Sequence, residues 1–211
     1  MTAAPRPLVI GVLALQGAYD AHAKTLTALG ATPRLVRVPQ ELEALDGLIM
    51  PGGESTTMLK FLERNGFFDI LQTWVRTTPT FGTCAGAILL ANHVENPPQR
   101  SLAALDITVE RNAYGRQIDS TILTAETSLP GPPLEMVFIR APRIRLTGPN
   151  VETLATRDGF PTLVRSGHLL AATFHPELSA DPRVHQFFLS LIRDHKAAAA
   201  HQSTVPTGDL L

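Results

Sequence analysis

One cysteine of this sequence stands where a nucleophile could act. Cys84 lies in the segment Gly82-Thr-Cys-Ala-Gly86, between a short apolar run that predicts a strand and an apolar run that predicts a helix. A nucleophile on such a sharp turn is held in strained backbone geometry, and small flanking residues let the chain pack closely there. The start of a helix favours the thiolate, and the backbone N–H of Ala85 would face an oxyanion on a substrate bound at sulfur. A lone cysteine is more often a buried core residue, but this context favours a nucleophile.

A thiolate nucleophile needs a base, and a histidine follows another apolar strand pattern. His175 and Glu177 come directly after the run at residues 169–174. Because the carboxyl ends of parallel strands meet at one edge of a sheet, we expect both side chains near Cys84. Glu177 could then reach back to the imidazole and fix its tautomer. The other histidines lack such a carboxylate and are expected on the surface or on a helix face: His22, His93, His168, His185, His195 and His201.

A pair of glycines ends a third apolar run. Gly52 and Gly53 follow Pro51, after the strand pattern at residues 47–50. Glycines at a strand end let backbone amides point outward, and such a turn can form the other half of an oxyanion hole. Alone, the pattern would indicate only a tight turn. All three motifs are expected at strand carboxyl ends, where open α/β sheets bind their ligands.

The elements that would position these motifs alternate through the first half of the chain. The expected strands are residues 8–15, 34–38, 47–50 and 80–82, and the expected helices are 18–29, 55–66 and 85–93. Continuous apolar strands alternating with helices predict a mostly parallel sheet with helices on both faces.

The second half is more polar and richer in short strands. We expect strand-like structure over 106–126, with a turn at Tyr114-Gly115, and strands at 136–140, 151–156, 162–165 and 169–174. A last helix is expected after Asp181-Pro182. Residues 197–211 show no apolar periodicity and are expected to be a disordered tail. Residues 1–196 then form one α/β domain.

Composition excludes several classes of protein. The 211 residues carry 18 Lys and Arg against 19 Asp and Glu, a net charge of −1, which argues against a dedicated nucleic-acid binder. One cysteine excludes an intrachain disulfide framework and a cysteine-cluster zinc site. No apolar run approaches the ~18 residues of a membrane span. The run at residues 8–15 could also be a short signal peptide, but the helical pattern after Gln16-Gly17 favours a strand. We therefore expect a cytoplasmic protein that binds neither nucleic acid nor membrane.

Six segments together resemble the class I, or triad-type, glutamine amidotransferases, and among them the glutaminase subunits of pyridoxal 5′-phosphate synthase. In chain order they are Val12-Leu-Ala-Leu-Gln-Gly17, Pro51-Gly-Gly-Glu-Ser-Thr-Thr-Met58, Gly82-Thr-Cys-Ala-Gly86, Glu110-Arg-Asn-Ala-Tyr-Gly-Arg-Gln117, Phe138-Ile-Arg-Ala-Pro142 and Phe174-His-Pro-Glu-Leu178. The fourth and fifth segments narrow the likeness to the synthase subunits. Tyr114 stands where that family usually has Phe, and the loop at 96–100 and the tail after Lys196 also differ. The resemblance implies a flavodoxin-like amidotransferase fold with a small antiparallel portion.

The resemblance also implies an activity and its residues. Cys84 would attack the side-chain amide of L-glutamine to form a γ-glutamyl thioester, His175 would move the protons, and Glu177 would orient His175. Gly53 and Ala85 would supply the oxyanion amides. The implied glutamine-binding residues are Gly53, Glu54, Ser55, Arg111, Ile139 and Arg140. Arginine is also, on physical grounds, the bidentate partner for a free α-carboxylate. Gln16 is expected near the oxyanion loop.

The implied partner is a larger, barrel-shaped synthase subunit in a hetero-oligomeric complex. It would join the released ammonia with a pentose phosphate and a triose phosphate to make pyridoxal 5′-phosphate, a step of vitamin B6 biosynthesis. The chain itself is expected to bind no cofactor and no metal, and its Gly52-Gly53 turn lacks the residues of a phosphate loop. Two alternatives stay open. A free-standing γ-glutamyl hydrolase or another amidotransferase subunit would share the fold, whereas a non-catalytic module would have no need of all three triad residues.

Overall fold

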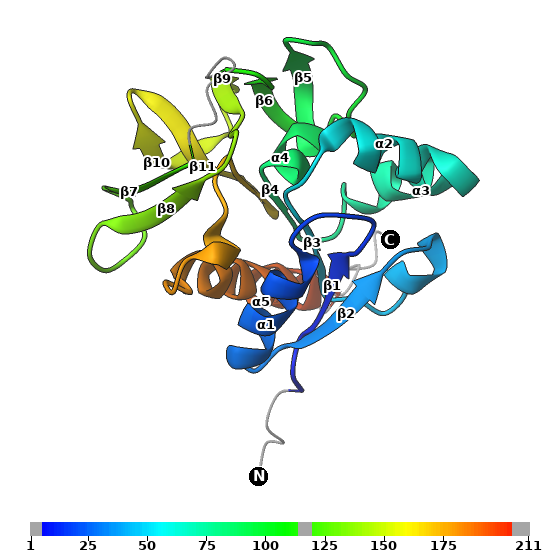
Figure 1. Cartoon of the computed structure of the whole chain (residues 1–211). Coiled ribbons are helices and arrows are strands. Elements are labelled where there is room, and N and C mark those ends of the chain that lie inside the picture. Colours follow the sequence, from blue (N-terminus) through cyan, green and yellow to red (C-terminus); the bar gives the residue numbers. More distant parts are fainter. Residues whose placement is uncertain (1–5, 114–119, 204–211) are drawn as a thin grey trace, which may run out of the picture.

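Seven strands form the central sheet of the computed structural model, which describes residues 6–113 and 120–203 (Figure 1). Their order across the sheet is β10-β11-β12-β4-β3-β1-β2. The parallel strands are β1 (Val9–Leu13), β2 (Thr32–Val36), β3 (Gly47–Met50), β4 (Thr80–Thr83) and β12 (Leu169–Ala172). At one edge, β10 (Glu152–Arg157) and β11 (Phe160–Ser166) run antiparallel. The predicted mostly parallel sheet is therefore present.

The register of four neighbouring strands brings their carboxyl ends together. Ala172 at the end of β12 pairs with Thr83 at the end of β4, and Met50 at the end of β3 pairs with Gly82. β1 lies next to β3 on the other side. The segments that follow these four strands therefore leave the sheet along one edge.

Helices cover both faces of the sheet (Figure 1). One layer holds α1 (Tyr19–Ala28) and α5 (Arg183–Ser203), and the other holds α2 (Ser55–Glu63), α3 (Phe67–Trp74) and α4 (Ala85–Leu90). Every residue of β3, β4 and β12 is buried, because each strand lies between these layers. This burial on both faces is the reason that the strands are continuous apolar runs rather than alternating ones.

Two of the predicted helices are shorter than expected. The helix expected over 55–66 ends at Glu63, and a 3₁₀ turn, η2 (Arg64–Gly66), leads into α3 through Gly66, whose φ of 67° breaks the helix. The helix expected over 85–93 ends at Leu90. Residues Ala91–Glu95 instead form strand β5, because they pair with β6 (Leu105–Glu110).

Two small sheets lie beside the central one. β5 and β6 are joined by β9 (Arg143–Thr147), a strand that the sequence did not predict, and β7 (Thr121–Ala125) pairs with β8 (Leu134–Phe138). The predicted turn at Tyr114-Gly115 lies outside the described residues. The β7–β8 and β6–β9 pairs supply the small antiparallel portion of the fold.

The last helix is longer than the sequence indicated. α5 continues to Ser203, so residues 197–203, expected to be a disordered tail, are helical, and residues 204–211 lie outside the described part. The segment from Ala197 contains four consecutive alanines. Alanine has the highest helix propensity, so this segment extends a helix without any apolar periodicity.

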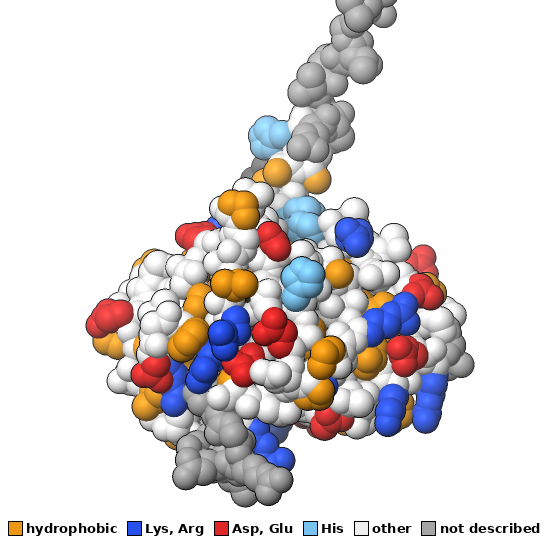
Figure 2. Space-filling view, turned by 90° about the horizontal axis from the view of Figure 1, so that it is seen from above, with side chains coloured by type: hydrophobic (Ala, Val, Ile, Leu, Met, Phe, Trp, Pro, Cys, Tyr) orange, Lys and Arg blue, Asp and Glu red, His pale blue; other side chains and the backbone are white. Residues whose placement is uncertain are grey.

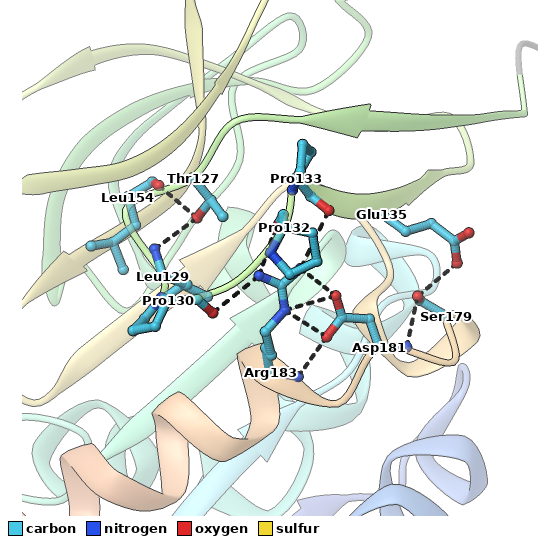
Figure 3. Close-up of polar contacts among 10 residues, drawn as sticks. All are labelled: Thr127, Leu129, Pro130, Pro132, Pro133, Glu135, Leu154, Ser179, Asp181 and Arg183. Carbon is cyan, nitrogen blue, oxygen red and sulfur yellow. Dashed lines mark hydrogen bonds and ion pairs between the residues drawn. The ribbon is translucent and has the colours of Figure 1, made fainter.

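Arg183 fixes the start of α5 to the loop between β7 and β8 (Figure 3). Its guanidinium donates hydrogen bonds of 2.7 to 3.3 Å to three backbone carbonyls, those of Pro130, Pro132 and Pro133. It also pairs with the Asp181 carboxylate at 2.6 Å. Nearby, the Ser179 hydroxyl donates a 2.7 Å hydrogen bond to Glu135 on β8. These contacts position the short 3₁₀ helix η3 (Pro176–Leu178), which carries the His-Pro-Glu motif.

The surface carries charges of both signs. On the face shown in Figure 2, acidic and basic side chains are interspersed among neutral ones rather than gathered by sign. None of the helices in the described part of the chain is both long enough and apolar enough to cross a bilayer.

Candidate active site

Cys84 occupies a tight turn between β4 and α4. Its φ of 47° and ψ of −103° are strained for a residue with a side chain, and its N–H donates to Ala172 O at 2.8 Å. A Cβ on Gly82 would lie 2.6 Å from the Gly86 backbone, and a Cβ on Gly86 would collide with Met50 O. The glycines at both ends of Gly-x-Cys-x-Gly are therefore required by the close approach of α4 to β3 and β4.

His175 and Glu177 leave the neighbouring strand β12 and turn back over its end. His175 Nδ1 lies 2.8 Å from Glu177 Oε1, and the backbone N–H of His175 donates to Val137 O on β8 at 2.8 Å. Burial alone would lower the pKa of His175, but hydrogen bonds and charges of Cys84 and Glu177 raise it to about 10. The protonated imidazole is therefore stable at neutral pH between two groups that carry or can carry negative charge.

The glycine turn after β3 packs against both reactive side chains. A Cβ on Gly52 would collide with the His175 ring and lie 3.2 Å from Cys84 Cβ. Gly53 has a φ of 147°, a conformation that favours glycine. Gln16, after β1, fixes the turn with two hydrogen bonds: its Nε2 donates to Glu54 O at 2.8 Å, and Glu54 N–H donates to its Oε1 at 3.1 Å. Four adjacent strand ends thus meet at this point.

A pocket of about 380 Å³ opens between these motifs. Its lining comprises Gly53, Glu54, Ser55, Cys84, Ile88, Arg111, Asn112, Ile139, Arg140 and His175. All six residues expected to bind glutamine are among them. The sequence analysis did not single out Ile88 or Asn112. Glu177 lies behind His175, away from the pocket.

Two of the expected binding residues already have partners within the protein. Glu54 caps α2 by accepting from Thr57 N at 2.6 Å and Thr56 N at 3.1 Å; burial would raise its pKa, but these hydrogen bonds hold it below its ordinary value. Arg111 donates to Thr56 Oγ1 at 2.8 Å and lies 3.6 Å from Glu54 Oε1. Among the described residues, by contrast, no hydrogen bond or ion pair holds the Arg140 guanidinium.

Comparison with known proteins identifies the family. Residues 12–194 match the SNO glutamine amidotransferase family. The chain belongs to this family. It is 60% identical over 185 residues to pyridoxal 5′-phosphate synthase subunit PdxT of Koribacter versatilis, covering 88% of this chain and 96% of that protein. It is 51% identical over 188 residues to PdxT of Solibacter usitatus, covering 86% and 97%.

A solved structure agrees with this assignment. A crystal structure of a glutamine amidotransferase superposes with a TM-score of 0.81 at 45% identity, covering 87% of this chain and 98% of that one. The amidotransferase family and fold predicted from the sequence are therefore confirmed.

Two histidines of this amidotransferase are buried, and one of them lies beside a carboxylate that the sequence analysis did not expect there. His22 and His185 are completely buried, whereas His93 and His201 are exposed and His168 and His195 are intermediate. His22 Nε2 lies 3.3 Å from Glu177 Oε2. A signal for this burial was present, because His22 precedes the buried Leu26 by one helical turn and His185 precedes Phe188 and Leu189. Both were expected on the surface or on a helix face; each does lie on a helix face, but on the buried one.

Proposed function

We propose that this chain is the glutaminase subunit of a pyridoxal 5′-phosphate synthase. It hydrolyses L-glutamine to L-glutamate and ammonia and passes the ammonia to a synthase subunit. The observation that carries the proposal is the 60% identity to a PdxT over 96% of that protein's length. The pocket supports it, because the Cys84 thiol, the His175 imidazole and the Arg140 guanidinium line the same space of about 380 Å³.

The Cys84 thiolate is the nucleophile in this mechanism. Sγ attacks the side-chain carbonyl carbon of glutamine, and the His175 imidazolium gives its proton to the departing nitrogen, so that ammonia leaves and a γ-glutamyl thioester remains. His175 then takes a proton from water, which attacks the thioester and releases glutamate and the thiolate. Glu177 keeps the Nδ1–H of His175 on its own Oε1, so that the other ring nitrogen faces the reacting atoms.

The residues that line the pocket bind the other parts of the substrate. The Ala85 N–H at the start of α4 and the Gly53 N–H stabilise the oxyanion of each tetrahedral intermediate. Arg140 provides a guanidinium for the α-carboxylate of glutamine, and Arg111, fixed by Thr56, adds positive charge beside it. Glu54, Ser55 and Ile139 complete the wall around the substrate.

The synthase partner covers the edge where the strand ends meet. Ammonia at neutral pH is mostly ammonium, a poor nucleophile, so release into a docked, barrel-shaped partner keeps it unprotonated. Two apolar side chains stand exposed at this edge, Ile139 at 38% and Leu178 at 47%. In a protein with interspersed surface charges, such residues beside a pocket suit a protein interface.

The experiment is a glutaminase assay of the purified chain, alone and with the synthase subunit of the same organism, at saturating glutamine. We expect little hydrolysis by the chain alone and a large increase in the complex, and none from Cys84→Ala in either state. Full activity without the partner, with no increase on adding it, would favour the free-standing hydrolase. Wild-type hydrolysis by folded Cys84→Ala would exclude Cys84 as the nucleophile.

A further inference from the structure

Two buried imidazole groups lie next to the catalytic residues, on the side that faces the core. His22 on α1 and His185 on α5 are each 0% exposed and lie between the helices of one layer and the sheet. His22 Nδ1 lies 2.9 Å from His185 Nε2. On its other side, His22 Nε2 lies 3.3 Å from Glu177 Oε2 and 3.3 Å from Thr83 Oγ1, the residue before Cys84. A line of polar side chains thus runs from Cys84 through His175 and Glu177 to two buried histidines.

Both buried rings are neutral. Burial, followed by the charges of His185 and His175, holds the pKa of His22 well below its ordinary value. Burial also lowers the pKa of His185 to about 4. A neutral imidazole has one N–H and one nitrogen that only accepts.

The neighbours determine which nitrogen of each ring carries the hydrogen. Ionised Glu177 has only acceptors, so the hydrogen of His22 belongs on Nε2, which faces Glu177. His22 Nδ1 must then accept, and His185 donates its Nε2–H to it. His185 Nδ1 is left without a hydrogen, and no hydrogen-bond partner of this atom is found in the described part of the chain. Each N–H of the pair therefore faces an acceptor.

Glu177 needs such a donor. Its Oε1 accepts from His175 at 2.8 Å, but its Oε2 has no well-aligned hydrogen bond from any described residue, and its side chain is 0% exposed. A buried, ionised oxygen without a donor is strongly unfavourable. His22 Nε2, which also lies within hydrogen-bond distance of Thr83 Oγ1, is in ion-pair contact with this oxygen at 3.3 Å and can supply that donor.

We propose that His22 is a positioning residue for the catalytic base. Its Nε2–H holds the second oxygen of Glu177, so that the first stays on His175, and His185 fixes the tautomer of His22 that makes this contact. The proposal rests on the proposed function, since it assigns the Glu177–His175 pair to acid–base catalysis.

The expected consequence of removing His22 is a change in pH dependence. The titratable groups that face this line come from four elements: Cys84 before α4, His175 and Glu177 at η3, His22 on α1 and His185 on α5. Glu135 on β8, which packs against η3, is bonded to Ser179 instead. Without the His22 donor, nothing holds the second oxygen of the Glu177 carboxylate, and its support of the His175 imidazolium weakens. The thiolate–imidazolium pair then forms only at higher pH.

Two variants separate the polar contact of His22 with Glu177 from the packing of its ring. His22→Leu removes the N–H with a side chain of similar size, and His22→Gln keeps an N–H near the position of Nε2. The matched control is His168→Leu. His168 and His195 form a second imidazole pair with the same 5.1 Å centroid separation and an interplanar angle of 52° against 51°, but His168 contacts Val75 O and no catalytic residue.

Each protein is assayed in complex with the synthase subunit between pH 5.5 and 9.5, and the pH dependence of Cys84 alkylation by iodoacetamide is measured in parallel. For His22→Leu we expect kcat to fall about tenfold or more at neutral pH with KM unchanged. The acid limb of kcat and the alkylation midpoint both move to higher pH. His22→Gln recovers most of both, and His168→Leu behaves as the wild type.

A folded His22→Leu with wild-type profiles would overturn the proposal, and so would equal impairment of His22→Leu and His22→Gln, which would indicate packing alone. If His22→Leu does not fold, His185→Met tests the tautomer step: a smaller shift in the same direction supports the proposal, and unchanged profiles overturn it. Failure of the wild-type complex to hydrolyse glutamine would refute the proposed function. The alkylation profiles would still decide whether His22 positions the pair, because they need no glutamine.

Discussion

Gly52 is the residue whose lack of a side chain leaves room for the reactive groups. A methyl group there would collide with the His175 ring and lie 3.2 Å from Cys84 Cβ. We expect Gly52→Ala to displace the ring and to abolish glutaminase activity in the synthase complex while the fold is kept. The control is Gly30→Ala, where the new methyl group meets no atom within 4 Å but φ is 77°. It should lose roughly 1 kcal/mol of stability through its left-handed backbone and no activity. Wild-type turnover by Gly52→Ala would contradict the packing of this turn.

Protonation of His175 should also make the free energy of unfolding depend on pH. Its pKa is raised from 6.5 to about 10, so the stabilisation is fully present below pH 6.5 and is lost as the pH rises through about 10. Above about pH 8.5 the cysteine of the unfolded chain is itself a thiolate, so the histidine proton is then the difference between the states. We expect the free energy of unfolding, measured with urea, to fall between pH 8.5 and 10 in the wild type. Cys84→Ala, which loses the partner that raises this pKa, should show a flatter dependence, and equal slopes would contradict the ion pair.

At the scale of elements, the sequence predicted the parts of the fold that are buried on both faces. β3 and β12 are short, wholly buried strands, so their residues are apolar without interruption and their carboxyl ends could be placed from the sequence. β9 was missed although Arg143–Thr147 alternates basic and apolar residues, because so short a segment becomes a strand only by pairing with β6. Residues 91–93 of β5 were predicted as the end of a helix, because their pairing with β6 leaves no mark in the local pattern either. Local patterns do not record such pairing.

The sequence likewise predicted only some of the residues of the candidate site. Cys84, His175 and the Gly52-Gly53 turn could be located because each follows a recognisable strand. The roles of His22 and His185 could not, because a histidine on the apolar face of a helix has no local mark that distinguishes core packing from a polar contact. Only the crossing of α1 and α5 behind Glu177 brings them together.

The anchoring of α5 by Arg183 gives a prediction about an element. Its guanidinium is 16% exposed and joins Asp181 to three loop carbonyls (Figure 3). Hydrogen bonds to charged groups are worth about 1.5–3 kcal/mol, so we expect Arg183→Leu to lower the free energy of unfolding by about that amount. Arg165→Leu is the control, since Arg165 is 41% exposed and lies 3.8 Å from Glu152, a surface pair worth at most about 1 kcal/mol. Equal losses in urea denaturation would show that the loop contacts add nothing.

At the scale of the whole molecule, the parallel sheet places the reactive groups at one edge, apart from the rest of the surface. Four parallel strands deliver Gln16, Gly52, Cys84 and His175 to one edge, and the opposite ends of the strands carry none of these groups. Ammonia must therefore leave at this edge. A partner that receives it has to bind there, so loss of binding and loss of delivered ammonia should accompany each other.

Leu178 provides the test of that docking edge. It is 47% exposed, directly follows the His-Pro-Glu motif and has its N–H bonded to His175 O at 3.2 Å. We expect Leu178→Asp to weaken binding to the synthase subunit by about tenfold or more, because a charge buried in an interface must be desolvated. Ile70→Asp is the matched control: Ile70 is 48% exposed, but it lies on α3, beside Thr77 and near the amino end of β4. Binding is measured by titrating each folded variant with the synthase subunit and following both complex formation and glutaminase activation. If Ile70→Asp weakens the complex and Leu178→Asp does not, the partner docks at the amino ends of the strands, and ammonia cannot pass directly from the pocket into it.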